Sequence, residues 1–149
     1  MQKSNEIFAS EWLKFREDKI AVVYYDANNN VMAMMQNGSV IRFAVSPYVL
    51  DMSNCLLYFD DIHTRGSDFK LPIKSQAALT LGKGLTKDKF LEACMRMRQL
   101  GKGQSLYFIA SSEVHATLEE NFFTRKSNSF KFVSGILSWT LSNTFKSYC

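Results

Sequence analysis

The sequence is poor in the residues that build linkers, disulfides and metal sites. Two prolines and seven glycines among 149 residues exclude a long flexible linker. The three cysteines are an odd number without metal-type spacing, which favours free thiols in a reducing compartment. With His63 and His115 as the only histidines, we expect no metal site.

Long apolar runs are also absent. No stretch approaches the roughly 18 to 20 residues of a membrane span, and residues 1–6 lack the apolar core of a secretory signal. We therefore expect a cytoplasmic or nuclear protein without membrane contact. The net charge of +4 permits an acidic partner, but the basic residues are spread along the chain. Several late aromatic residues have helical spacing and are expected in a core instead of on a nucleic acid: Phe122, Phe123, Phe130, Phe132 and Trp139.

The first third of the chain predicts one helix and a small antiparallel meander. Residues 5–19 place apolar side chains at three- and four-residue spacing, with Ser4 or Asn5 as a cap. Residues 20–25 have the composition of a buried strand. The runs 31–35 and 39–43 flank Asn37-Gly38, which is a strong hairpin signal.

From Cys55 onward the pattern changes, because strands and helices alternate. Strands are predicted over residues 55–60, 77–82 and 105–110. Helices are predicted over residues 87–100, 112–122 and 132–146. Thr86 is the expected cap of the 87–100 helix, and Gly101 lies just past its end. Such alternation favours parallel pairing, so a mostly parallel sheet is predicted.

Two groups of residues suggest phosphate chemistry. The turn 64–68 carries Arg65, Gly66 and Asp68, and the predicted helix 87–100 carries Arg96 and Arg98. Guanidinium groups and closely approaching backbone both suit phosphate oxygens. Two helical residues that are two apart share no face, so only one arginine is expected to point into a cleft. The alternative is a solvated surface with weak ion pairs.

Longer strings resemble known families. Asp-Ile-His-Thr-Arg-Gly-Ser-Asp-Phe-Lys-Leu at residues 61–71 is similar to the fifth motif of SecA-type and superfamily-two helicase motors, and residues 92–101 look like the sixth. Residues 22–144 more closely resemble the C-terminal, helicase-like part of large eukaryotic proteins labelled ubiquitin thioesterase or ubiquitinyl hydrolase. The central strings are residues 57–72, 80–90 and 93–104, with a late string at 137–144.

This resemblance implies a three-layer RecA-like second lobe spanning residues 1–149, as a fragment of a larger protein. It implies that four residues of the turn lie at a lobe interface, namely Thr64, Arg65, Gly66 and Asp68, and that Arg96 and Arg98 approach the triphosphate. Glu92 and Gln99 depart from the helicase pattern, which puts the role of Arg98 in doubt. No Gly-x-x-x-x-Gly-Lys-Ser/Thr occurs, so we expect no nucleotide bound by this chain alone, and ATP only with an upstream P-loop lobe.

The thioesterase label raises a second hypothesis. A cysteine-type deubiquitinase needs a thiolate, a histidine and an orienting acid, for which Cys94, His63 and Asp61 (or Asp60) are the candidates, with ubiquitin as the possible substrate. Because Cys94 lies within an apolar helical pattern, a structural cysteine is the commoner outcome. A third hypothesis is a scaffold that performs no catalysis.

Overall fold

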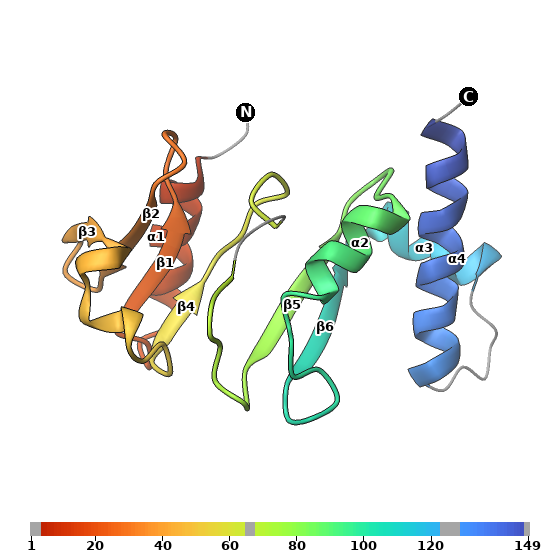
Figure 1. The fold of residues 1–149 in the computed structure, drawn as a ribbon. Helices are drawn as coiled ribbons and strands as arrows, with labels where there is room; N and C mark the ends of the chain where they lie inside the picture. The colour runs from red at the N-terminus through yellow and green to blue at the C-terminus, as the bar shows by residue number, and fades with distance from the viewer. Residues whose placement is uncertain (1–3, 65–67, 123–128, 148–149) are drawn as a thin grey trace. The chain divides into compact units, whose positions relative to one another are not determined.

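The protein is mixed α/β. The computed structural model describes residues 4–64, 68–122 and 129–147 (Figure 1). It divides into two compact units, Met1–Pro72 (unit 1) and Ile73–Cys149 (unit 2), which are treated separately below. The single lobe expected from the resemblance stays a prediction. Within the described residues, no helix is long and apolar enough to cross a membrane.

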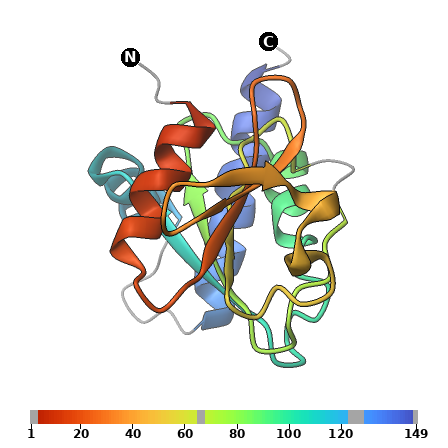
Figure 2. The same cartoon turned by 90° about the vertical axis from the view of Figure 1, so that its left-hand side faces the viewer.

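Unit 1 consists of one helix on a four-stranded sheet with the order β3-β2-β1-β4 (Figure 2). The first three strands pair antiparallel, which confirms the predicted meander, whereas β4 pairs parallel with β1. The sheet is therefore mixed, although a mostly parallel one was predicted. Its elements are α1 (Asn5–Phe15), β1 (Ala21–Tyr25), β2 (Val31–Met35), β3 (Val40–Arg42) and β4 (Cys55–Leu57), with short 3-10 helices η1 (Phe43–Val45) and η2 (Pro47–Val49).

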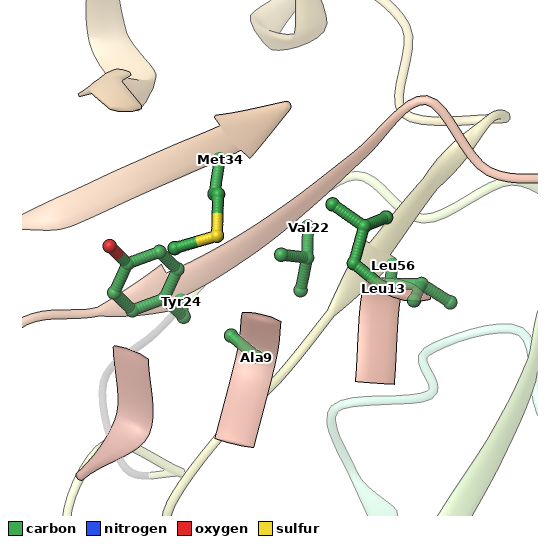
Figure 3. Packing of buried hydrophobic residues seen from close by; sticks show 6 residues of the cluster. All are labelled: Ala9, Leu13, Val22, Tyr24, Met34 and Leu56. Carbon is green, nitrogen blue, oxygen red and sulfur yellow. The ribbon is translucent and has the colours of Figure 1, made fainter. Parts of the chain in front are cut away.

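Strand β1 forms the centre of unit 1 because both of its faces are buried. Val22 and Tyr24 point towards α1, whereas Val23 packs on the opposite side with Ala33 and Met52. Burying a large apolar side chain contributes roughly 1.5–3 kcal/mol, so both faces of β1 contribute to the stability of the unit. Figure 3 shows the helix-side cluster, which consists of Ala9, Leu13, Val22, Tyr24, Met34 and Leu56.

Helix α1 begins as predicted but ends earlier. Ser4 caps it, since its Oγ accepts a hydrogen bond from the backbone N–H of Ile7 at 3.3 Å. The predicted end at residue 19 is wrong, because the side-chain amide of Gln36 donates to the carbonyls of Leu13, Arg16 and Lys19 at 2.8–3.2 Å. These contacts satisfy carbonyl groups that a longer helix would have used.

Unit 2 contains a parallel strand pair joined by a helix. Strands β5 (Gln76–Leu81) and β6 (Ser105–Ala110) run parallel in full register from Gln76 opposite Ser105 to Leu81 opposite Ala110, and α2 (Lys87–Cys94) lies between them in sequence. The parallel pairing predicted for this half is confirmed. Helices α3 (Ser112–Asn121) and α4 (Ser129–Ser147) complete the unit. Its core consists of Leu81, Phe90, Val114, Leu118, Ile136 and Trp139.

The start of α2 is held by α4 instead of by its own predicted cap. Thr86 makes no side-chain cap hydrogen bond. The backbone N–H of Lys87 donates to Thr144 Oγ1 at 3.0 Å, and Asn143 Nδ2 donates to the Leu85 carbonyl at 3.1 Å. The capping function that was predicted from a neighbouring residue is therefore supplied from 57 residues away.

Candidate functional site

His63 is the centre of a polar cluster in unit 1. Its Nδ1 contacts Asp60 Oδ1, and its Nε2 lies 2.8 Å from Asn29 Oδ1. The His63 backbone N–H also donates to Asp60 Oδ1 at 3.0 Å. Both ring nitrogens therefore face oxygen atoms, an arrangement that a doubly protonated imidazolium satisfies with two donated hydrogen bonds. The turn 60–64 and the hairpin turn after β1 are joined through this one ring.

Two further residues fix the ring and its acid. The Tyr25 ring stacks on the imidazole with a centroid distance of 4.0 Å and an interplanar angle of 9°. Asn5 Nδ2 donates to Asp60 Oδ2 at 2.8 Å and to the Tyr25 carbonyl at 3.0 Å. Asn29 adopts a positive φ of 62°, a conformation that asparagine tolerates better than most residues. The cluster thus ties the first residue of α1 to the end of β1 and to both turns.

Asp60 is the acid that orients His63. Burial opposes ionisation of its carboxyl group, but hydrogen bonds from Asn5 and His63 outweigh burial and lower the pKa of Asp60. Asp61, the other acid predicted from the sequence, is exposed, and its backbone carbonyl accepts a hydrogen bond from Thr64 Oγ1 at 3.0 Å. The sequence could not show which of the two adjacent aspartates orients His63, because that depends on the geometry of the turn.

Cys94 does not have the surroundings of an activated nucleophile. It is the last residue of α2 and packs against the core of unit 2. Burial raises the pKa of the Cys94 thiol to about 11, so little thiolate is present near neutral pH. His63 belongs to unit 1, so the predicted pairing of Cys94 with His63 stays a prediction. His115, the second histidine, is exposed and lies 3.6 Å from Glu119 Oε2.

The residues predicted to meet a phosphate are described only in part. Arg65 and Gly66 lie outside the described residues. Thr64 ends the turn that His63 anchors, and Asp68 is exposed. Trp139 is buried in the unit 2 core, as expected, whereas Phe123 and the side chains of Phe130 and Phe132 lie outside the described part of the chain.

Arg96 and Arg98 do not lie on a helix, which corrects the prediction of a helix over residues 87–100. Helix α2 ends at Cys94, and both arginines lie in the connection to β6. Met97 between them is buried, with an exposed fraction of 4%. Arg96 Nε donates to the Glu92 carbonyl at 3.4 Å, whereas the Arg98 side chain is exposed. Because both arginines lie outside the helix, helical spacing does not limit which of them can face a ligand.

Gln104 closes this arginine-bearing turn, a role that the sequence analysis missed. The side-chain Oε1 of the buried Gln104 accepts a hydrogen bond from the Gln99 backbone N–H at 2.9 Å. The backbone N–H of Gln104 donates to the Gln99 carbonyl at 3.2 Å. Gly101 and Gly103 have positive φ values of 79° and 130°, which only glycine adopts easily. The two glycines that flank Lys102 indicate a tight turn in the sequence, but nothing in the sequence pattern indicates that Gln104 is buried and closes it.

Metal binding finds no support in the described residues, where no group of three or more His, Cys, Asp or Glu side chains is placed to hold an ion. Comparisons with protein-family models, with curated proteins and with solved structures each returned no match to this chain.

Proposed function

We propose that the chain is a helicase-like module of a ubiquitinyl-hydrolase-type protein, with a RecA-like second lobe that forms one side of a nucleotide cleft. On this proposal Arg96 contacts the phosphates, and the turn that begins at Thr64 meets a P-loop lobe supplied by the same protein. The proposal rests on the resemblance of the central strings. The chain by itself holds no nucleotide and performs no hydrolysis.

The observation that carries the proposal is the β5-α2-β6 unit with its arginine-bearing turn. A parallel strand pair joined by a helix is a building block of nucleotide-binding α/β domains. The connection from α2 to β6 carries Arg96, Arg98 and Lys102 within seven residues. Unit 2 contains eleven Lys and Arg residues against five Asp and Glu, a net charge of +6, which favours an anionic ligand.

The chemistry of Cys94 gives no support to the thiol-hydrolase alternative. A nucleophilic cysteine needs a lowered pKa, usually from a helix N-terminus or a neighbouring cation, but Cys94 ends its helix and its thiol pKa is raised by burial. Ubiquitin therefore enters our proposal as a substrate of the larger protein, handled by other segments.

Nucleotide binding tests the proposal directly. A fluorescent ATP analogue is titrated into the chain alone and into the chain together with the P-loop lobe of its parent protein. We expect weak binding alone and much tighter binding with the lobe. Arg96→Ala should then weaken binding by about tenfold or more, because a charge-assisted hydrogen bond contributes roughly 1.5–3 kcal/mol.

The matched control is Arg42→Ala, which removes an exposed arginine from β3 in unit 1. It should leave nucleotide affinity unchanged. If the two lobes together bind no nucleotide, or if both variants weaken binding equally, the proposed cleft is wrong and the scaffold hypothesis gains. Labelling of the chain by a ubiquitin-based thiol probe, lost in Cys94→Ala, would instead favour the hydrolase.

A further inference from the structure

The cluster around His63 joins parts of unit 1 that no other described side chain joins in this way. Asn29 belongs to the turn between β1 and β2, His63 and Asp60 belong to the turn after β4, and Asn5 begins α1. The imidazole is largely covered, with 13% of the side chain exposed, and Tyr25 stacks on its face. A single titratable ring therefore connects the two turns.

The contacts of this ring depend on its protons. Nδ1 faces a carboxylate oxygen and Nε2 faces an amide oxygen. Oxygen accepts but does not donate, so a ring with a proton on each nitrogen makes both contacts, whereas a neutral ring makes only one of them. Histidine is the side chain whose ordinary titration falls near physiological pH.

We propose that His63 is a proton-dependent latch, which holds the turn 60–64 to the hairpin turn 26–30 when the ring is doubly protonated and releases Asn29 when one proton leaves. The inference stands on unit 1 geometry and holds whether or not the proposed nucleotide cleft exists.

Several acidic side chains lie on the elements that carry the cluster. Asp60 and Asp61 share the turn of His63, Asp26 follows β1, and Glu6 lies in the first turn of α1, while Arg42 on β3 acts on Asp26. Asp26 is held by the Asn30 and Asn28 backbone N–H groups, which lower its pKa and keep it charged. The pKa of Asp60 is also lowered. The latch is therefore closed on the acid side of histidine titration and fails at still lower pH, when Asp60 takes up a proton.

Substitutions of Asn29 test the latch because they change one acceptor. Asn29→Asp keeps an acceptor that can never donate, Asn29→Gly removes the acceptor and tolerates the positive φ, and Asn28→Gly is the control in the same turn. Two signals are measured across the pH range in which histidine ordinarily titrates. NMR measures the upfield shift that the stacked Tyr25 ring causes in the His63 ring signals. Hydrogen exchange measures the protection of the His63 backbone amide.

Three chains should behave alike: the wild type, Asn28→Gly and Asn29→Asp. At acid pH we expect the His63 ring signals to be shifted upfield and the His63 amide to be protected from exchange. Both effects should decrease as pH rises, and the amide protection should fall about tenfold. Asn29→Gly should show low protection throughout. The latch is refuted if the wild type keeps its signals unchanged while only Asn29→Asp responds to pH, because the Asn29 amide then turns round and donates to the neutral ring. It is equally refuted if Asn29→Gly behaves like the wild type.

Discussion

Among the glycines at 82, 84, 101 and 103 of unit 2, Gly103 is the one where an added methyl group should cause the greatest loss of stability. Its φ of +130° lies in a region that side-chain-bearing residues rarely adopt, and a Cβ built there would lie 2.5 Å from the carbonyl oxygen of Ile73. A backbone oxygen has no rotamer to escape to, so the chain itself has to shift. Backbone strain costs roughly 1–3 kcal/mol and overpacking a similar amount. We therefore expect Gly103→Ala to lower the free energy of unfolding of unit 2 by roughly 2 to 6 kcal/mol.

Two other glycines separate the causes of this loss. Gly101 also has a positive φ, of 79°, but a Cβ there would meet nothing within 4 Å. Gly101→Ala should therefore cost only the strain, about 1–2 kcal/mol. Gly82 has neither a positive φ nor a close neighbour, so Gly82→Ala should change stability little or raise it by about 0.4–1 kcal/mol.

Urea unfolding followed by tryptophan fluorescence measures these differences. The chain has two tryptophans, Trp12 in unit 1 and Trp139 in the core of unit 2, so a Trp12→Phe background leaves a reporter of unit 2 alone. The expected order of stability is Gly82→Ala, then Gly101→Ala, then Gly103→Ala. If Gly103→Ala is no less stable than Gly101→Ala, the close approach of Ile73 to this turn is wrong.

Three other perturbations follow from contacts described above. Thr144→Val removes the acceptor of the Lys87 N–H and should cost unit 2 about 1 kcal/mol in urea unfolding; an equal loss in the control Ser142→Ala would show that the cap is not the cause. Because the pKa of Asp60 is lowered in the folded state, its contribution to stability is fully present above the ordinary aspartate pKa and is lost as pH falls from there through the lower folded-state pKa. Asp60→Asn should therefore flatten the acid dependence of unit 1 unfolding, measured at Trp12, and an unchanged slope would contradict this. Burial raises the thiol pKa of both Cys55 and Cys94 from 9.0 to about 11, so in a Cys149→Ser background alkylation at neutral pH should be about a hundredfold slower in the native chain than in the unfolded chain. Faster native alkylation of Cys94 would instead restore it as a candidate nucleophile.

Local patterns in the sequence predicted most of the elements. The β-branched run before Tyr25, the Asn37-Gly38 hairpin and the Ser4 cap all act through near neighbours, and all three are confirmed. The hairpin is closed by the Ser39 carbonyl, which accepts the Met35 N–H at 2.9 Å, and Gly38 has the positive φ of 85° that such a turn requires.

The ends of helices and the partners in the site were not predictable in the same way, because they depend on distant residues. Gln36 ends α1 from about 20 residues away, and Asn29 reaches His63 across 34 positions. Periodicity cannot reveal such partners, since it records only which face of an element is apolar. The same limit explains why the sequence could not decide between Asp60 and Asp61 and why Arg96 was placed on a helix that in fact ends at Cys94.

The contact between α4 and the start of α2 also sets an order of assembly. In unit 1, α1 and the β1-β2-β3 meander are complete within the first 42 residues, so they can form while the rest of the chain is still being synthesised. In unit 2, the hydrogen bond from the Lys87 N–H to Thr144 Oγ1 cannot form until Thr144, 57 residues later in the chain, has been synthesised. Until then α2 has an open first turn, and Phe90 lacks the α4 side chains that complete its core. Newly made unit 2 should therefore remain the more vulnerable half to proteases and chaperones until residues 129–147 have emerged.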